Sequence, residues 1–441
     1  MNDTSPRNLD LDSAVADIEA RYVAAHPNSK ARYERALKSM PGANTRTVLH
    51  YDPFPVTVVK GEGARVTDLD GHEYRDLLGE YTAGLYGHSE PAILDALRTA
   101  LDSGLVLGGP NEFEAQLAEV MCKRFPAIEL IRFCNSGTEA NMMCASLARA
   151  ITGRRKIVGF YGGYHGGLMG FPGTSGSPMN ASDEFYLIPF NDPDSVQALF
   201  SQKADNIAAV ILEPMMGGGG CIPAEAEFLR VLRELTEAND SLLIFDEVMT
   251  SRLAPGGMQE RTGITPDLAA FGKYLGGGVS FGAFGGREDL MARLDPRAPD
   301  ALTHSGTFNN NVLTMAAGLA GLEKVLTPEA TVKLNHAGDK LRERLAETAR
   351  SHGVGAQVMG LGSMICIHFQ NQPIRRPEDT TETDPATRKL LQLDFNLRGF
   401  YLSRRGFMSL SLPLTDDDYD DTVTAFEDFL DENKAVLPAL S

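Results

Sequence analysis

Residues 242–246 read L-L-I-F-D, an unbroken apolar run that ends on an aspartate. A short segment that is apolar at every position is typical of a strand buried on both faces of a sheet. Residues 208–213, A-A-V-I-L-E, repeat the pattern and end on a glutamate. In open parallel sheets, ligands bind beyond the carboxyl ends of the strands. The two runs therefore predict the type of fold and the sheet edge at which polar side chains matter most.

Three more short runs of this type are spread over the middle of the chain: I-R-F-C (131–134), K-I-V-G-F (156–160) and D-L-A-A-F (267–271). Helical stretches separate the runs. This alternation predicts an α/β fold in which helices cover both faces of a mostly parallel sheet. We expect this large domain to span residues 85–327.

The region before the large domain predicts helices and a small sheet. Residues 11–39 carry two helical patterns that break at H-P-N-S, where Asn28 or Ser29 is expected to cap the second helix. Residues 56–78 predict a short sheet. Its turn, D-L-D-G (68–71), is interpreted as a hairpin because it lacks the further acidic positions of a calcium loop.

The region after the large domain, residues 328–441, returns to mixed helices and strands. S-M-I-C-I-H-F at 363–369 predicts a strand, and residues 373–385 predict a loose loop. We expect this region and the N-terminal segment, residues 1–84, to form a smaller α+β domain together.

The composition argues against several classes of partner. The 441 residues include 41 basic and 59 acidic side chains, and the net charge of −18 disfavours nucleic acid or an anionic membrane as the main partner. The longest apolar run, residues 207–212, is far too short to span a bilayer. The N-terminal residues lack the apolar segment of a secretory signal. The five cysteines form no C-x-x-C pair, so we expect a cytoplasmic protein without a metal site.

A phosphate cradle is predicted after the first run of the large domain. N-S-G-T-E-A (135–140) follows I-R-F-C and opens a helical stretch. Ser136, Gly137 and Thr138 would offer hydroxyl and backbone N–H groups at a helix N-terminus, where phosphate binds well. An ordinary helix cap is the alternative for this hexamer alone.

Carboxylates end two of the predicted strands, at Glu213 and Asp246. A carboxylate buried at a strand end is costly without a cationic partner, although either residue could instead cap a helix. Lys273 follows the next run, in A-A-F-G-K-Y-L-G-G-G (269–278). A solvated lysine in a turn is the ordinary alternative. A partly desolvated lysine, however, has a lowered pKa and can condense with a carbonyl group.

These features together describe one ligand. The cradle suits a phosphate, the aspartate suits a protonated ring nitrogen, and the lysine suits an aldehyde. Pyridoxal 5'-phosphate carries all three groups, and we expect it as the cofactor.

The motifs around these residues occur in the order and spacing of a known family: N-S-G-T-E-A (135–140), Y-H-G (164–166), E-P-M (213–215), D-E-V-M-T (246–250), G-K-Y-L-G-G-G (272–278) and S-G-T-F-N-N-N (305–311). Over residues 40–435 the chain resembles the class III, or ω-type, aminotransferases of the fold-type-I pyridoxal phosphate enzymes. P-G-A-N (41–44) and G-A-F-G-G (282–286) are similar to the glutamate-1-semialdehyde aminomutase branch. The resemblance implies a mostly parallel sheet of the seven-stranded type between helices.

The resemblance also implies a role for each matching residue. Lys273 forms a Schiff base with the cofactor and later moves a proton, and Asp246 keeps the ring nitrogen protonated. Thr307 reaches the phosphate of a neighbouring subunit, which implies a homodimer with shared active sites. Taken alone, His165 is only a packed, hydrogen-bonded histidine. The other implied cofactor contacts are Ser136, Gly137 and Thr138 at the phosphate, Tyr164 and Val248 on the ring faces, and Glu213 orienting polar groups.

The choice of substrate depends on two arginines. The aminomutase pattern has N-S-P-V-R after the first glycine, whereas here N-T-R-T-V places Arg46 two residues after Asn44, on an expected extended lid. Arginine binds carboxylates bidentately, so this shift changes where a substrate acid is held. A surface loop arginine is the alternative for Arg46. The second candidate is Arg405 in S-R-R-G-F (403–407), whose neighbour Arg404 is expected to face solvent.

N-T-R-T-V, E-Y-T-A-G-L-Y-G-H (80–88) and R-G-F together resemble the β-amino acid aminotransferases of the β-phenylalanine type. This resemblance implies ping-pong transamination from a small-molecule amino donor to a 2-oxo acid, 2-oxoglutarate or pyruvate. It also implies that Arg46 and Arg405 bind carboxylates. Tyr81 and Tyr86 are candidates for an aromatic pocket, and the alternative for both is a place in the core. The main alternative is a glutamate-1-semialdehyde 2,1-aminomutase. A non-catalytic protein of this fold, a racemase and a decarboxylase are further alternatives.

Overall fold

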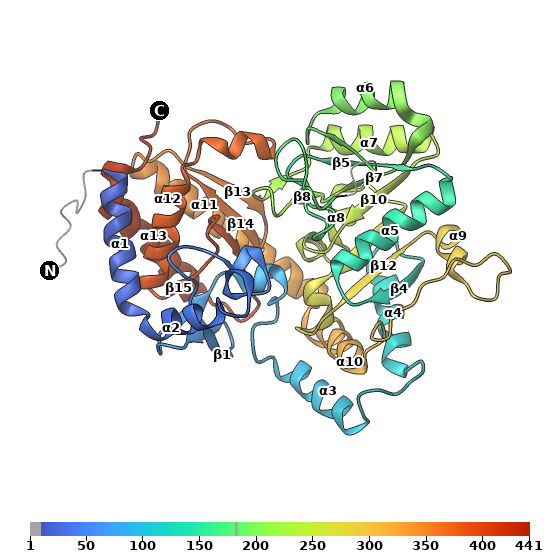
Figure 1. Ribbon diagram of the computed structural model, residues 1–441, viewed down its shortest axis with the longest axis horizontal. Coiled ribbons are helices and arrows are strands. Elements are labelled where there is room, and N and C mark those ends of the chain that lie inside the picture. Colours follow the sequence, from blue (N-terminus) through green and yellow to red (C-terminus); the bar gives the residue numbers. More distant parts are fainter. Residues whose placement is uncertain (1–9, 181–183) are drawn as a thin grey trace.

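The computed structural model describes residues 10–180 and 184–441, and its centre is a seven-stranded sheet (Figure 1). All neighbouring strands are parallel except for the two pairs that β12 makes. The prediction of a mostly parallel, seven-stranded sheet is therefore confirmed. In order across the sheet, the strands are β4 (Leu130–Cys134), β12 (Gly282–Gly286), β11 (Leu268–Gly272), β10 (Leu242–Asp246), β7 (Ile207–Leu212), β5 (Lys156–Phe160) and β6 (Phe185–Ile188).

Two of these strands, β6 and β12, lie outside the predicted runs. The sequence of β12 is G-A-F-G-G, and a glycine-rich segment ordinarily indicates a loop. A Cβ atom at Gly282 would lie 2.2 Å from the carbonyl oxygen of Ser136, and one at Gly286 would lie 2.2 Å from that of Asp267. The glycines thus allow β12 to lie between two other strands. Hydrophobic patterning contains no sign of this requirement.

Helices cover both faces of the sheet, as predicted (Figure 1). One face forms an apolar core with α5. The other face packs against α6 and α7 over β5, β7 and β10, and against α4 and α10 over β11 and β12. The main helices of this region are α3 (Pro91–Asp102), α4 (Glu112–Arg124), α5 (Gly137–Thr152), α6 (Pro193–Lys203), α7 (Ala226–Ala238), α8 (Gly257–Thr262) and α10 (Val312–Ala320).

The two ends of the chain lie together at one end of the molecule (Figure 1). One sheet has the order β1-β2-β3-β15, so a strand from the C-terminal region completes the N-terminal hairpin, and a second sheet has the order β13-β14-β16. The strands are β1 (Val58–Glu62), β2 (Arg65–Asp68), β3 (Glu73–Asp76), β13 (Gln357–Leu361), β14 (Met364–His368), β15 (Phe400–Tyr401) and β16 (Phe407–Ser409). The helices are α1 (Leu11–Ala25), α2 (Pro27–Ala36), α11 (Pro328–Ser351), α12 (Pro385–Leu397) and α13 (Asp416–Asn433).

The start of α2 differs from the prediction. Its N-cap residue is His26, with Pro27 as the first helical residue, and not Asn28 or Ser29. The backbone N–H groups of Asn28 and Ser29 instead donate to the two carboxylate oxygens of Asp70, at 2.7 and 3.0 Å. The capping carboxylate therefore comes from the hairpin turn, and local sequence around the helix does not reveal it.

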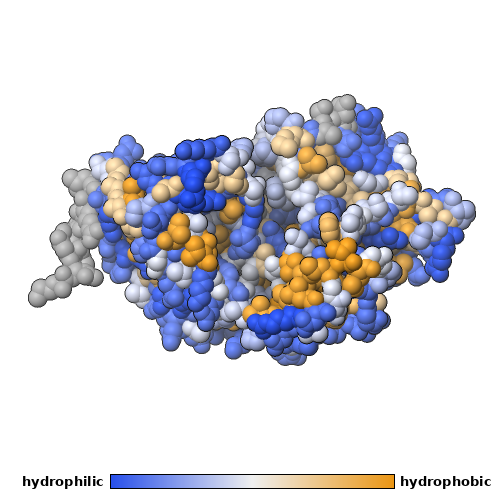
Figure 2. All heavy atoms as spheres, turned by 60° about the horizontal axis from the view of Figure 1, so that its bottom comes forward, coloured by the Kyte–Doolittle hydropathy of each residue, from blue (hydrophilic) through white to orange (hydrophobic). Residues whose placement is uncertain are grey.

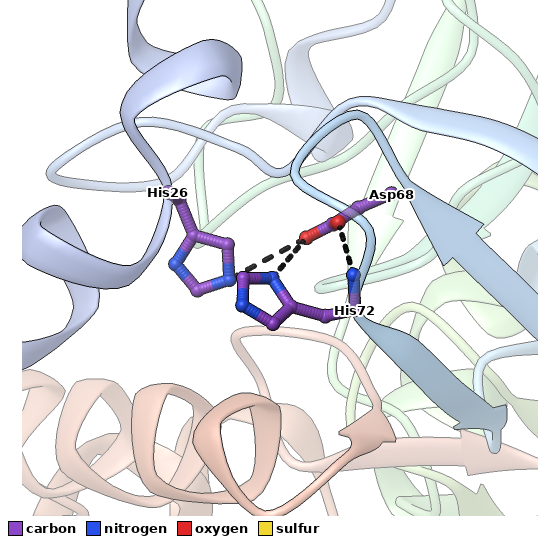
Figure 3. Close-up of side chains that lie close together, drawn as sticks. All are labelled: His26, Asp68 and His72. Atoms are coloured by element: carbon purple, nitrogen blue, oxygen red, sulfur yellow. Dashed lines mark hydrogen bonds and ion pairs between the residues drawn. The ribbon is translucent and has the colours of Figure 1, made fainter.

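The D-L-D-G turn is a hairpin, as predicted, and a buried carboxylate holds it together (Figure 3). Asp68 Oδ1 accepts hydrogen bonds from the backbone N–H groups of Asp70 and His72, at 2.9 and 2.8 Å. Its Oδ2 accepts from the Tyr74 hydroxyl at 2.6 Å and from His72 Nδ1 at 3.1 Å. The buried His26 ring lies 2.9 Å from the Tyr74 hydroxyl through Nε2. This network ties the N-terminal helices to the small sheet.

Other expectations about the loops need correction or lie outside the described residues. The loose loop expected at 373–385 contains a 3-10 helix, Pro377–Glu382. The expected lid contains two 3-10 turns, Pro41–Ala43 and Thr47–Leu49, so only the short stretch between them is extended. Residues 1–9, considered above for a secretory signal, lie outside the described residues. Within the described ranges, no helix is long and apolar enough to cross a membrane.

Candidate active site

Asp246 ends β10 at the carboxyl edge of the sheet, and it is 3% exposed. Its Oδ2 accepts hydrogen bonds from Asn141 Nδ2 and His165 Nδ1, both at 2.8 Å. Its Oδ1 accepts from the backbone N–H of Val248 at 3.0 Å. These three donors offset the cost of removing an ionised carboxylate from water, which is otherwise large. The site thus contains a fixed, buried negative charge.

Of the two side chains that donate to Asp246, one was predicted to form a hydrogen bond and the other was not predicted. His165 was expected to be a packed, hydrogen-bonded histidine, and the structure shows that its partner is Asp246. Asn141 lies on α5 and was not predicted. Its only sequence signal is its position, one helical turn after Thr138 and therefore on the same face of the helix.

Glu213 follows β7 and holds two main-chain segments in place. Its Oε2 accepts a hydrogen bond from the N–H of Tyr164 at 3.2 Å, and its Oε1 accepts from the N–H of Gly217 at 3.1 Å. Burial raises the pKa of this carboxyl to about 7, while His165 opposes the rise and Asp246 adds to it. Glu213 therefore positions backbone around the site, in line with its expected orienting role.

Lys273 directly follows β11, with a left-handed backbone conformation at φ +55°. Such a φ is uncommon for a residue with a Cβ and often marks a functional constraint. Burial lowers the pKa of the Lys273 amine to about 8, and the charge of Arg46 contributes to the fall, whereas Asp246 and Glu213 act in the opposite direction. A large fraction of this amine is therefore neutral, and so nucleophilic, at mildly alkaline pH.

The predicted phosphate cradle lies at the start of α5. Ser136 is the N-cap residue, and its hydroxyl oxygen accepts a hydrogen bond from the backbone N–H of Glu139 at 3.2 Å. The helix-cap alternative is therefore correct for this serine, and the binding of phosphate here stays a prediction. The backbone N–H groups of the first turn point out of the helix end, where its dipole favours an anion.

Glycines bring the segments of the site close together. A Cβ at Gly137 would lie 2.7 Å from a methyl group of Val248, and a Cβ at Gly272 would lie 3.2 Å from the other. A Cβ at Gly166 would lie 2.3 Å from the Thr138 hydroxyl. The cradle, the segment after β10 and the lysine segment are therefore packed directly against one another. Side chains at these positions would push them apart.

Tyr164 and Thr307 lie at the exposed margin of the site. Tyr164 is 56% exposed, so it is not a core aromatic residue. Thr307 is exposed in a surface cavity of about 420 Å³, which is lined by residues 105–111 and by Phe308, while the cradle residues 136–138 are not part of its wall.

Two arginines and a tyrosine form what we call the arginine pocket: Arg46, Tyr81 and Arg405. The Cζ atoms of Arg46 and Arg405 lie 5.7 and 5.9 Å from the centre of the Tyr81 ring. Arg46 forms an ion pair with Glu80, and Arg405 Nη1 donates to the carbonyl of Gly218 at 2.8 Å. The structure thus brings together two residues that lie at opposite ends of the sequence. Glu80 was not predicted as a site residue.

Two residues that are close in sequence to Tyr81 or Arg405, Tyr86 and Arg404, are not part of the arginine pocket. Tyr86 is buried and packs against Tyr274 and Gly321, so it is a core residue and does not line the pocket. Arg404, which was expected to face solvent, is only partly exposed and donates to the carbonyl of Asp52 at 3.3 Å.

Comparison with known proteins shows which family this chain resembles. The model of the class-III aminotransferases matches residues 48–430. The beta-phenylalanine transaminase of Variovorax paradoxus is 50% identical and aligns over 97% of this chain and 98% of its own length. The crystal structure of a beta-phenylalanine aminotransferase from the same organism has a TM-score of 0.96, at 49% identity, and covers 98% of this chain and 100% of that chain.

A second group of relatives is more distant. The glutamate-1-semialdehyde 2,1-aminomutase of Thermomicrobium roseum is 38% identical and aligns over 90% of this chain and 96% of its own length. These matches span both regions of the chain that carry the candidate site.

Proposed function

Because the chain belongs to the class III aminotransferases, which makes it a pyridoxal 5'-phosphate-dependent transaminase, we propose that its donor is a β-amino acid of the β-phenylalanine kind. The proposed acceptor is 2-oxoglutarate or pyruvate. The observation that carries the proposal is the arginine pocket, in which Arg46 and Arg405 lie at similar distances from one tyrosine ring. The identity of 50% to a beta-phenylalanine transaminase supports it.

The residues at the sheet edge fit the cofactor in charge and in chemistry. We propose that Lys273 holds its aldehyde carbon, that Asp246 faces its ring nitrogen and that residues 136–138 hold its phosphate. Tyr164 and Val248 would lie against the two ring faces. The close approach of these segments, which the glycines at 137, 166 and 272 allow, supports this assignment.

The bound cofactor supplies an electron-accepting ring that carries the amino group from donor to acceptor. Lys273 Nζ takes up and returns the proton that moves during transfer, a role that suits an amine with a pKa near 8. Asp246 provides the fixed negative charge, and Asn141 and His165 keep that carboxylate oriented by donating to it. Donor and acceptor use the same site in turn, so each must find a place for its carboxylate.

A β-amino acid holds its carboxylate one carbon farther from the amine than the α-acid of the acceptor does. A single carboxylate site at a fixed distance would serve only one of the two substrates. Two long arginine side chains that meet at Tyr81 would provide a separate carboxylate site for each substrate. We therefore assign substrate binding to Arg46, Arg405 and Tyr81.

We also propose a homodimer with shared active sites, in which Thr307 completes the phosphate site of the partner subunit. Large apolar side chains are exposed on the adjoining surface, including Leu105, Val106, Leu107 and Phe308. Figure 2 shows apolar residues gathered in a broad patch on this side of the molecule. An exposed patch of this kind is typical of an interaction surface.

The remaining proposals concern organisation and location. We propose a large domain over residues 85–327 and a smaller one formed by 1–84 and 328–441, with a cytoplasmic location. The pairing of β15 with β3, which joins the two ends of the chain in one sheet, supports this division.

The proposal is tested by the first half of the reaction. Holoenzyme is mixed with racemic β-phenylalanine in the absence of any acceptor, and the absorbance of the lysine-bound cofactor is followed. We expect this absorbance to fall and to recover when 2-oxoglutarate or pyruvate is added. Persistent absorbance, together with turnover of glutamate 1-semialdehyde, would instead identify an aminomutase.

A further inference from the structure

The two arginines of the pocket are held by different kinds of group. Arg46 donates to the carboxylate of Glu80, whereas Arg405 donates to the main-chain carbonyl of Gly218. Among residues 10–180 and 184–441, no acidic side chain forms an ion pair with Arg405. A carbonyl accepts a hydrogen bond but carries no net charge. The charge of Arg405 is therefore available to a ligand, while that of Arg46 is already matched.

Glu80 reaches Arg46 from an unusual stretch of backbone. All four residues of Gly79–Thr82 have positive φ, at 50°, 45°, 52° and 81°. Only glycine adopts such values freely, and conformations of this kind are concentrated at functional sites. Asp76 Oδ1 braces the turn by accepting hydrogen bonds from the N–H groups of Leu78 and Gly79, each at 2.9 Å. The fold thus holds Glu80 in a position that an unconstrained chain would avoid.

Tyr81, the next residue, is a fixed platform for both guanidinium groups. Its ring stacks on Phe407 with centroids 5.9 Å apart and an interplanar angle of 8°, and its hydroxyl donates to the carbonyl of Val48 at 3.1 Å. Two cations at one ring repel each other. Glu80 offsets one of the two charges, and it does so only at Arg46.

We propose that Glu80 is the specificity-determining residue that switches Arg46 between a charged and an uncharged substrate group. When a substrate carboxylate enters the Arg46 side of the pocket, it displaces Glu80 and binds the guanidinium. When an aryl group occupies the same place, Glu80 stays on Arg46 and no unmatched cation faces the ring. This inference rests on the proposed function, because it requires a β-amino acid and a 2-oxo acid to use the pocket in turn.

The exposure of the pair suits an exchangeable contact. The side chains of Arg46 and Glu80 are 42% and 51% exposed. Ion pairs with this degree of exposure are weak and are readily replaced by another carboxylate. A fully buried pair would resist exchange, because separating it would leave an unpaired charge in a dry site.

The test compares a ligand that can place a carboxylate at Arg46 with one that can place only an aryl group there. Binding of glutarate, a dicarboxylate that is 2-oxoglutarate without its keto oxygen, is measured by calorimetry on wild-type and Glu80→Gln holoenzyme. We expect the variant to bind about two- to fivefold more tightly, because the internal competitor for Arg46 has lost its charge. With 1-phenylethylamine, a donor that lacks the carboxylate, we expect kcat/KM of the variant to fall by about two- to fivefold.

Two further variants complete the design. Glu80→Ala removes the same charge and should shift both quantities in the same opposite directions. Glu227→Gln makes the same chemical change in an exposed pair with Arg230 on α7, and it should change neither quantity. Thermal unfolding checks that each variant is folded.

The proposal requires that loss of the Glu80 charge strengthens binding of the carboxylate ligand and lowers kcat/KM for 1-phenylethylamine. If neither quantity changes, or if both ligands gain or both lose, Glu80 does not act as the switch. Failure of the proposed function is recognised separately, as a wild-type enzyme that does not accept an amino group from β-phenylalanine. The calorimetric arm needs no turnover, so it decides the role of Glu80 in that case as well.

Discussion

The cofactor end of the large sheet and the arginine pocket hold their charges in different ways. Asp246 is buried and receives three hydrogen bonds, from Asn141 on α5, from the buried His165 in the segment after β5 and from the N–H of Val248. The arginines of the pocket lie on segments from the two ends of the chain and are partly exposed. Within the part of the chain that the structure describes, only Arg46 has a carboxylate partner.

This difference follows from what each region binds. The cofactor stays in place through every turnover, so a preorganised charge that never rearranges is an advantage. The substrates alternate, so their site needs charges whose partners can be exchanged. Long side chains on short turns provide this, and a carboxylate at the end of a buried strand does not. The predictions below, which start with the largest effect, test this contrast.

Replacement of Lys273 by alanine should abolish transamination, with a loss of about 10⁴-fold or more, because both the covalent attachment and the proton transfer depend on its amine. Initial rates and the absorbance of bound cofactor provide the measurement. Lys324→Ala, at an exposed lysine, is the matched control and should retain activity. Wild-type rates in the Lys273 variant would show that the site lies elsewhere.

Asp246→Asn should lower kcat by about 100- to 1,000-fold, because it removes the fixed charge and leaves the shape of the side chain almost unchanged. The exposed Asp289→Asn, whose partner is Arg287, serves as the control. Single-turnover rates with β-phenylalanine separate this chemical step from product release. A variant with wild-type kcat would mean that the charge at β10 is structural only.

The lowered pKa of Lys273 predicts a pH-dependent stability of the apoenzyme. In the folded protein this pKa is about 8, against an ordinary 10.5, with burial as the main cause. Between these two pH values the unfolded chain binds a proton that the folded chain does not, so stability rises with pH. The apo Lys273→Met variant should be more stable than wild type by roughly 3 kcal/mol at pH 7.

This stability gap should close as the pH rises to about 10.5. Denaturant unfolding of both apo proteins at several pH values measures it. A gap that does not depend on pH would show that the lysine amine is not desolvated. The buried and rigid character of the cofactor region would then need to be reconsidered.

In the arginine pocket the effects should be smaller and should depend on the ligand. Arg405→Ala should lower kcat/KM for β-phenylalanine by about tenfold to thirtyfold, the loss of one charge-assisted contact. The value for 1-phenylethylamine should change little, because this donor has no carboxylate. Arg404→Ala is the matched control next to it in sequence. Equal losses for both donors would indicate a structural role for Arg405.

Much of the cofactor region was predictable from the sequence for a geometric reason. Parallel strands that run in the same direction end at the same edge of a sheet, so Glu213, Asp246 and Lys273 were expected to meet there. The apolar runs of β5, β7, β10 and β11 were visible because each strand is buried on both faces. The N-terminus of α5 was predictable because the residue that caps it, Ser136, directly precedes the helix in the sequence.

Other features depended on contacts between distant segments. Asn141 and Glu80 are ordinary polar residues in the sequence, and only the fold shows that they contact Asp246 and Arg46. Arg252 is fully buried, and its guanidinium donates to Ser363, to Ser409 and to the carbonyl of Leu410, on segments far along the chain. No local pattern marks a residue whose partners are so remote.

The order of residues along the chain was enough to indicate the apolar strands β4, β5, β7, β10 and β11, the N-terminus of α5, the carboxylates and the lysine, because each of these depends on a strand or helix end that local sequence encodes. Tertiary structure alone decided which of the two arginines carries an unmatched charge. That property depends on Glu80 and Gly218, which are brought to the pocket by a strained turn and by a loop after β7. The balance of charge at a site depends on every group packed around it, and packing is settled only when the whole chain has folded.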